Sequence, residues 1–232
     1  MKKNNENIVS ENTNTDELLI IKHNEQRKKI TKYFKITTPR VTFIGLILGI
    51  NIIFAFIGKY IMGMIPFPMG GGFLVIELTF FTYLVSNYIL NLFYTIILLT
   101  AATWLRLGLV GDEPIGLLAL YLGDLGGLLI FALLVFIIKI FFYVKKQNKL
   151  NEIKWQYIIF TIAGIFSILL ISGLEVLFNW SFMLRLYGIN GKAADIFLIP
   201  IFAFNITKYT INFVIFLSIL YVLNSLKTKF NF

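Results

Sequence analysis

The sequence is poor in the residues that most enzyme mechanisms use. It has no cysteine, which excludes disulfides, thiolate metal sites and thiol nucleophiles. Its single histidine, His23, lies in a polar segment near the start of the chain. The three glycines at 70–72 are not followed by the Lys and Ser or Thr of a phosphate-binding loop. Hydrolytic chemistry and intrinsic ATP hydrolysis are therefore poorly supported, and we expect a protein that is not an enzyme and has no cofactor.

Hydrophobic residues, by contrast, make up 58% of the 232 residues. They form recurrent apolar runs of about 20 residues, the length of a helix that crosses a bilayer. A soluble domain of this size has no interior large enough for so many Phe, Ile and Leu side chains. We therefore expect a polytopic membrane protein.

The apolar runs predict an all-α membrane protein with six transmembrane helices. Residues 73–107 are too long for one span and fit two, with a turn at residues 87–91. A polar and basic tail, residues 1–40, precedes the membrane domain of residues 41–226, and a short tail, residues 227–232, follows it. In the first tail, residues 16–35 fit either a helix on the membrane surface or a solvated basic segment. The predicted spans are 41–62, the two within 73–107, 115–143, 157–178 and, after a loop at 179–195, a last span that ends at about residue 226.

The positive charges give the expected orientation. Of the 21 Lys and Arg residues, nine fall in residues 1–40, four in 145–154 and two at 227 and 229. Only four fall in the loops on the other side, one of them Arg106, and Lys139 and Lys208 lie in the spans. By the positive-inside rule both termini are cytoplasmic. The net charge of +9 is thus explained by a basic membrane rim, and we expect no nucleic-acid partner.

Polar groups inside the apolar segments gather toward the predicted outer ends of the spans. Asn205 and Lys208 are three residues apart, so they share a helix face, and both are costly in a membrane unless they face a cavity or a partner. Glu77 follows the first outer loop, while Glu175 and Asn179 are one turn apart where the fifth span ends. This convergence predicts a ligand pocket open to the outside.

Each polar residue also has a simpler interpretation. Asn179 can cap its helix, and Asn205 can bond a neighbouring helix. Glu175 can be an exposed acid or a partner of Arg185. Lys208 can extend toward the lipid headgroups or pair with Glu77 or Glu175. The acids Glu77, Asp124 and Glu175 lie in three different spans. They do not show the helical spacing expected of metal ligands or of a catalytic pair of carboxylates.

Two further segments indicate contacts with other molecules. Pro66, Phe67 and Pro68 precede the glycines at 70–72, and this composition predicts a loop rather than a continued helix. Gly45 and Gly49 form a small-xxx-small pair in the first span, which allows a second helix to approach closely.

At these residues the sequence resembles the substrate-binding S components of energy-coupling factor (ECF) vitamin transporters, over roughly residues 40–226. It is most similar to the riboflavin-binding members, whose signature resembles Asn-Tyr-Phe…Leu-Pro-Leu-Tyr followed by Pro-Phe-Asn-Leu-Ile-Lys-Gly. The corresponding residues here begin at Asn179-Trp180-Ser181-Phe182 and at Ala203-Phe204-Asn205-Ile206-Thr207-Lys208. An acidic and amide-containing stretch of the family is replaced here by residues 116–121.

The resemblance implies a vitamin-binding subunit in a bacterial plasma membrane, with riboflavin as the expected vitamin. It implies that Asn179, Asn205, Lys208 and Glu77 bind the vitamin and that the loop of Pro66, Phe67 and Pro68 closes over it. Gly45 and Gly49 would dock on a membrane coupling subunit that works with two ATPase subunits. The alternatives are an S component for another vitamin or precursor, and a membrane assembly protein without a ligand.

Overall fold

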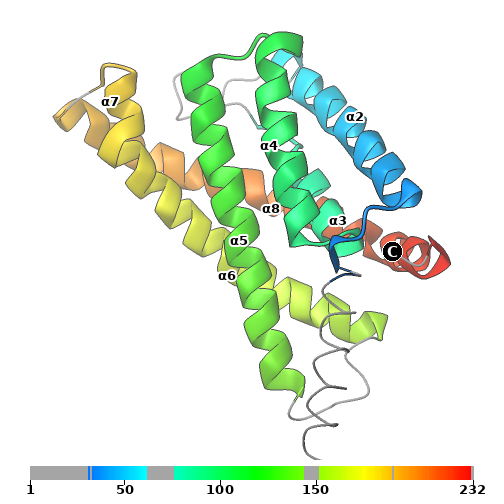
Figure 1. The fold of residues 1–232 in the computed structure, drawn as a ribbon. Helices are drawn as coiled ribbons and strands as arrows, with labels where there is room; N and C mark the ends of the chain where they lie inside the picture. Colours follow the sequence, from blue (N-terminus) through cyan, green and yellow to red (C-terminus); the bar gives the residue numbers. More distant parts are fainter. Residues whose placement is uncertain (1–30, 32, 62–75, 144–151, 190, 231–232) are drawn as a thin grey trace, which may run out of the picture. The chain divides into compact units, whose positions relative to one another are not determined.

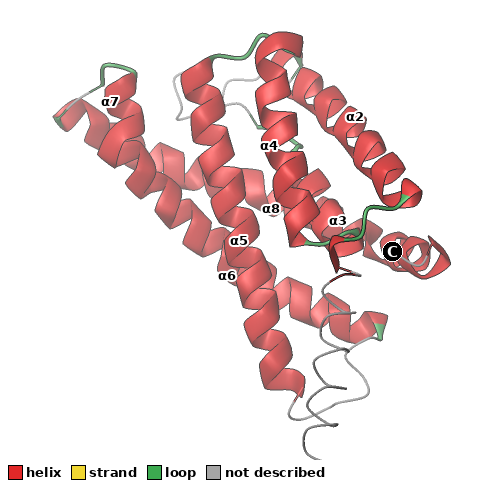
Figure 2. Cartoon of the chain, viewed as in Figure 1, coloured by secondary structure: helices red, strands yellow, loops and turns green. Residues whose placement is uncertain are grey.

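The structure is a computed structural model that describes residues 31, 33–61, 76–143, 152–189 and 191–230. All regular elements within these residues are helical (Figures 1 and 2). The loop residues Pro66, Phe67 and Pro68 lie outside the described residues. In chain order the helices are α2 Thr38–Tyr60, α3 Phe80–Ile89, α4 Leu92–Leu109, α5 Pro114–Tyr143, α6 Ile153–Phe178, the π-helix η2 Asn179–Met183, α7 Leu184–Leu186 and α8 Lys192–Phe230.

The prediction of an all-α membrane protein with six principal helices is confirmed for the described part of the chain. Five helices are long and apolar enough to cross a membrane: α2, α4, α5, the continuous segment Ile153–Leu186, and α8. The remaining one, α3, has 10 residues and a length of roughly 15 Å, about half of a hydrocarbon core. The orientation of the termini stays a prediction.

The turn between α3 and α4 lies where the sequence predicts it. Helix α3 ends at Ile89, and Asn91 begins the next helix as its N-cap. The Asn91 side chain accepts a hydrogen bond from the backbone N–H of Tyr94 at 3.0 Å, which satisfies one of the free donors at the start of α4. This cap explains why a 35-residue apolar segment breaks into two helices at this point.

The centre of the helical unit is packed with aromatic rings. Helix α6 packs against α5 and α8, and α3 packs against α8. Phe131 of α5 lies with its ring centre 5.0 Å from that of Phe213 and 5.9 Å from that of Phe160. Edge-to-face and tilted pairs of this kind stabilise packing beyond the area that they bury. This core holds the inward faces of α5, α6 and α8 at fixed positions.

Glycines of α5 let its neighbours approach closely. A Cβ at Gly126 would lie 3.2 Å from Cδ1 of Ile171, and one at Gly127 would lie 3.2 Å from the Phe80 ring. Side chains at these positions would push α6 and α3 away from α5. The Gly123–Gly127 segment is therefore the part of α5 where three helices come closest.

Helix α2 is attached to the other helices by a buried amide. Asn51 is fully buried and donates through Nδ2 to Thr82 Oγ1 at 2.7 Å and to the Thr79 carbonyl at 3.3 Å. Its opposite side is exposed along Thr42, Gly45, Gly49 and other residues at helical spacing.

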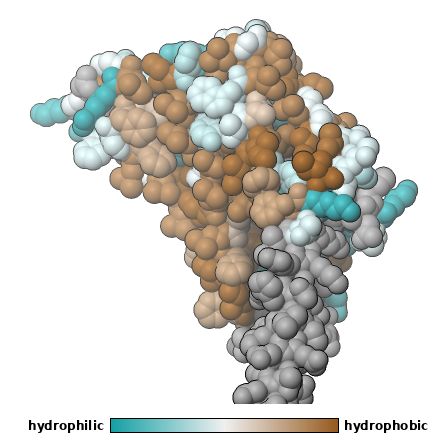
Figure 3. Space-filling model, in the orientation of Figure 1, coloured by the Kyte–Doolittle hydropathy of each residue, from teal (hydrophilic) through white to brown (hydrophobic). Residues whose placement is uncertain are grey.

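The chain divides into two compact units, residues 1–41 and 42–232. The second unit contains the helices that carry the candidate site. The face of the molecule in Figure 3 is mostly hydrophobic along these helices, as a lipid-facing surface requires.

Candidate ligand-binding site

The two polar residues of α8 singled out in the sequence are both buried. Asn205 is 5% exposed and Lys208 is 4% exposed. Pro200 lies inside α8 one turn before Asn205 and cannot donate a backbone hydrogen bond. The Asn205 side chain donates through Nδ2 to the Ile201 carbonyl, four residues earlier, at 3.0 Å. Its amide oxygen is left to accept from another group.

Lys208 forms an ion pair with an acid that the sequence analysis did not assign to it. Its Nζ lies 2.9 Å from Oδ1 of Asp124 on α5, and the Asp124 side chain is fully buried. The Tyr209 hydroxyl also donates to Asp124 Oδ1, at 3.4 Å. The expected partners of Lys208, Glu77 or Glu175, are therefore replaced by Asp124 as the direct contact.

Glu175 of α6 lies close to this pair, in the space that the missing side chain of Gly123 leaves open. A Cβ at Gly123 would lie 1.6 Å from Oε1 of Glu175 and 3.2 Å from the Tyr209 hydroxyl, so only glycine fits there. Glu175 is 7% exposed, and its carboxylate interacts electrostatically with the Lys208 ammonium. Asp124 and Glu175, which appeared scattered in the sequence, thus converge on one lysine.

Asn179 lies where α6 changes its helical geometry. Its Nδ2 donates to the Glu175 carbonyl at 2.8 Å and approaches Oε2 of Glu175 at 3.5 Å. Asn179 therefore caps α6, as its simpler interpretation stated, and also contacts the carboxylate of the site. It also begins the π-helix Asn179–Met183. Such helices are rare and occur frequently at functional sites.

The segment after the π-helix is held against the start of α5. The Tyr187 hydroxyl lies 3.4 Å from the position of a Cβ at Gly116. Partial burial, together with the nearby Glu113 carboxylate, raises the pKa of the Tyr187 phenol. The phenol therefore stays neutral at physiological pH and acts as a hydrogen-bond donor at this end of the bundle.

Glu77 belongs to a different ion network. It receives two hydrogen bonds of 2.7 Å from the guanidinium of Arg106, whose side chain is 2% exposed. Arg106 also contacts Asp112 Oδ2 at 2.6 Å, and Lys59 lies 3.2 Å from Asp112 Oδ1. The sequence placed Arg106 in an outer loop, whereas it lies in the last turn of α4 because Glu77 and Asp112 compensate its charge.

Asn212 connects the two networks. It lies one turn after Lys208, and its Nδ2 donates to the Lys208 carbonyl at 2.8 Å and to the Glu77 carbonyl at 2.9 Å. Its Oδ1 accepts from the backbone N–H of Phe81 at 2.8 Å. The sequence analysis missed this residue, although its spacing from Asn205 and Lys208 puts all three on one helix face.

The cluster of Asp124, Glu175, Lys208 and Tyr209 can bind a polar ligand but is not a metal centre. Within the described residues no group of three or more His, Cys, Asp or Glu side chains is placed to hold a metal ion. The available chemistry is hydrogen bonding and charge, inside an apolar and aromatic surrounding, which is the usual make-up of a small-molecule site.

Comparison with solved structures gives an informative match. No family model matches the sequence, and no curated protein matches it significantly. A solved structure described as the S component of a bacterial ECF transporter superposes with a TM-score of 0.60 and 19% sequence identity. The match covers 81% of this chain and 96% of that protein. The chain has the S-component fold. At this level of identity, the likeness extends to the fold and does not identify the ligand.

Within the S-component fold, the face of α2 that carries Gly45 and Gly49 is open. A Cβ at either glycine would meet no atom within 4 Å. Among the described residues, neither glycine is therefore needed for packing.

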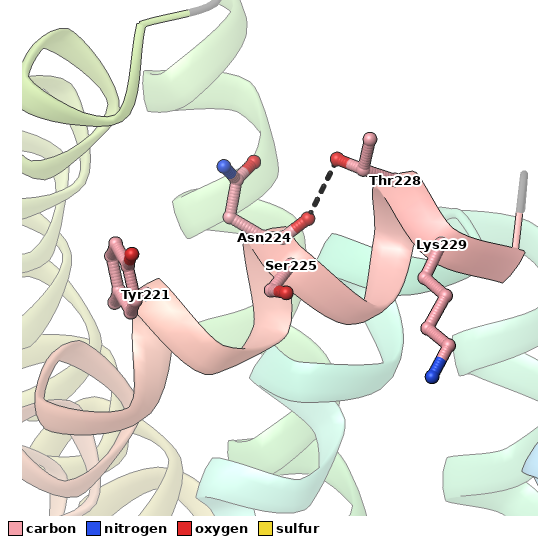
Figure 4. Close-up of a pocket in the computed structure, with 5 residues that line it drawn as sticks. All are labelled: Tyr221, Asn224, Ser225, Thr228 and Lys229. Carbon is pink, nitrogen blue, oxygen red and sulfur yellow. Dashed lines mark hydrogen bonds between the residues drawn. The ribbon is translucent and has the colours of Figure 1, made fainter.

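A surface recess lies farther along α8 and is separate from the cluster. It is lined by polar residues of the last turns: Tyr221, Asn224, Ser225, Thr228 and Lys229 (Figure 4). The Thr228 hydroxyl donates to the Asn224 carbonyl at 2.9 Å. Tyr221 is 13 residues after Lys208, roughly 20 Å along the helix. The recess therefore contains none of the predicted ligand-binding residues.

Proposed function

We propose that this protein is the vitamin-binding subunit of an ECF-type, ATP-driven importer in a bacterial plasma membrane. The observation that carries the proposal is the S-component fold over 81% of the chain, combined with a buried polar cluster on three of its helices. The subunit captures its ligand from outside the cell and breaks no bond. Energy comes from a partner module, because the sequence has no ATP-binding loop of its own.

Riboflavin is the first ligand to test, because the motif resemblance covers Asn179, Asn205 and Lys208. These residues, with Glu77, would anchor a flavin by hydrogen bonds to its carbonyl groups and ring nitrogens, while aromatic side chains stack on its rings. The loop of Pro66, Phe67 and Pro68 would close the pocket. Visible absorption and flavin fluorescence of the purified protein, measured during titration with riboflavin, test this directly. Quenching at one-to-one stoichiometry supports riboflavin, and an indifferent protein excludes it.

A different vitamin is the second candidate, and one contact favours it. Lys208 Nζ already donates to Asp124 Oδ1 at 2.9 Å, so its charge is compensated within the chain and is not reserved for a flavin. A ligand that interacts with the carboxylates instead leaves the pair intact.

Gly45 and Gly49 are proposed to dock on the membrane coupling subunit. The open space above both glycines supports this, since a partner helix can approach the α2 backbone closely there. With both termini in the cytoplasm, the coupling subunit and the two ATPases would lie on the side of the chain that carries most of its positive charge.

Co-purification separates the transporter proposal from a membrane assembly protein without a ligand. A tagged full-length chain, expressed together with a coupling subunit and its two ATPases from the same genome, is expected to retain all three in mild detergent. If the purified chain stays free of all three subunits under conditions in which they bind each other, the transporter proposal is wrong.

A further inference from the structure

The buried cluster around Lys208 carries more negative than positive groups. Asp124 and Glu175 are 0% and 7% exposed. Within the described residues, Lys208 pairs directly with Asp124 and lies within electrostatic range of Glu175. The other cation in electrostatic range of Asp124 is Arg106, which already binds Glu77 and Asp112. An uncompensated carboxylate is very costly at this depth, so it must meet a cation or take up a proton.

Hydrogen-bond acceptors are also left over in the cluster. Oδ2 of Asp124 is buried and has no partner among the described residues, because Lys208 and Tyr209 both contact Oδ1. The Ser172 hydroxyl, one turn before Glu175 on the same face of α6, is likewise buried and without a hydrogen bond there. Buried polar atoms are normally paired. Both atoms are therefore available to hydrogen-bond a group from outside the chain.

We propose that the ligand of this site carries a positively charged nitrogen, and that Asp124 and Glu175 bind it. The inference rests on the proposed function and specifies its substrate class: a small heterocyclic cation, rather than a neutral or anionic vitamin. The positive nitrogen lies beside Glu175 and Asp124 Oδ2, and Lys208 stays paired with Oδ1. Glycine at 123 leaves the space that lets the Glu175 carboxylate reach Asp124 and Tyr209.

The site also has a structural feature that can admit such a ligand. Asn179 contacts the Glu175 carboxylate and begins the π-helix, so the wall of the cluster on α6 departs from regular helical geometry next to its excess acid. Pro200 interrupts the hydrogen bonding of α8 near Asn205. Two of the three helices that form the cluster, α6 and α8, thus carry an irregularity near it.

The test compares ligands that match in shape and differ in charge. Isothermal titration of the full-length protein in detergent is carried out with 1-methylnicotinamide, a permanent cation, and with nicotinamide, its neutral counterpart. Thiamine serves as a larger cation, riboflavin as a larger neutral compound and nicotinate as an anion. We expect at least one cation to bind at least tenfold more tightly than every neutral or anionic compound. Preferred binding of a neutral or anionic probe, or no binding of either cation, overturns the proposal.

A substitution at Glu175 tests whether the preference for a cation comes from the cluster around Lys208. Glu175→Gln keeps the size of the side chain and removes one negative charge, and we expect it to weaken binding of the preferred cation at least tenfold. Glu152→Gln makes the same change at the exposed start of α6 and should leave the affinity unchanged. Unchanged affinity in Glu175→Gln overturns the assignment. If the Glu175→Gln variant does not fold, the comparison of matched ligands on the natural protein still tests whether the site prefers a cation. If the titration contradicts the cationic ligand, the chain can still co-purify with the coupling subunit and the ATPases. The proposed transport function and the proposed ligand class are thus tested independently.

Discussion

The two ion networks of this protein differ in their charge balance. The network of Arg106 and Lys59 with Glu77 and Asp112 contains two cations and two acids, and all four are paired within the described structure. The cluster around Lys208 contains one cation for Asp124 and Glu175, and one carboxylate oxygen is left without a partner there. The balanced network links helix ends and is complete by itself. The unbalanced one lies between helices and leaves an acceptor available to an additional group, as expected of a binding site.

Breaking the balanced network should have the largest effect on stability. Arg106→Met leaves the carboxylates of Glu77 and Asp112 without their main cation, at a cost of about 3–5 kcal/mol in the free energy of unfolding. Thermal unfolding in detergent, followed by circular dichroism or by loss of monodispersity, measures this effect. Arg185→Met, at an exposed position, is the matched control and should change stability little. Equal stability of the two variants would show that the Arg106 network is not structural.

The Lys208–Asp124 pair should show strong coupling in a double-mutant cycle. Lys208→Met alone leaves Asp124 buried and unpaired, whereas the double change Lys208→Met with Asp124→Asn removes both charges. We expect the double variant to be more stable than the single one by about 1–3 kcal/mol. Thermal unfolding of all four proteins of the cycle gives the coupling energy. Additive effects of the two substitutions contradict the observed pair.

Gly123 gives a sharper test of how Glu175 is placed. Gly123→Ala puts a methyl group at the position of the Glu175 carboxylate, which must turn away, and we expect a loss of about 1–3 kcal/mol in stability together with weaker ligand binding. Gly173→Ala introduces the same group on α6 where no atom lies within 4 Å. This control should be neutral or slightly stabilising, because alanine favours the helix. Ligand titration and thermal unfolding of both variants show whether the loss comes from the clash with Glu175 or from adding a methyl group to any helical glycine.

The smallest effect on the isolated chain is expected at the proposed docking face. Gly49→Leu adds a side chain in open space, so ligand affinity and unfolding temperature should stay close to those of the natural protein. Retention of the coupling subunit in the co-purification should fall strongly, because a larger side chain keeps a partner helix away from the backbone of α2. Gly108→Leu on α4, also in open space, is the control. Equal retention in both variants removes Gly49 from the interface.

The arrangement of helices was largely predictable from hydrophobicity alone. Apolar runs and their polar breaks predict most helices to within a few residues, and even the short turn at Asn91 follows from a polar residue that can cap a helix. The exception is the predicted loop at 179–195, where the helix continues to Leu186 and α8 begins at Lys192. Helices of this kind are apolar around most of their circumference. Periodicity therefore does not reveal which face turns inward, and this is the step at which the prediction of contacts failed.

The partners in the site were not predictable for that reason. Asp124 and Lys208 are 84 residues apart, and nothing local in the sequence relates the rotation of α5 to that of α8. The pairing of Arg106 with Glu77 was missed because a charged residue near a helix end is normally assigned to the loop. One signal was available: Gly123 before Asp124 marks a place where a neighbouring helix comes close.

The central claim is that the chain captures a small vitamin with the cluster on α5, α6 and α8. Its most direct test is mass spectrometry of small molecules released from the purified, denatured protein. The measurement is repeated on cells grown with excess vitamins and on the Glu175→Gln, Asn205→Ala double variant. We predict one vitamin-sized compound, near one per chain, from the natural protein and its loss from a variant that still folds. Release of the same compound from both proteins, or no bound compound under any condition, contradicts the claim.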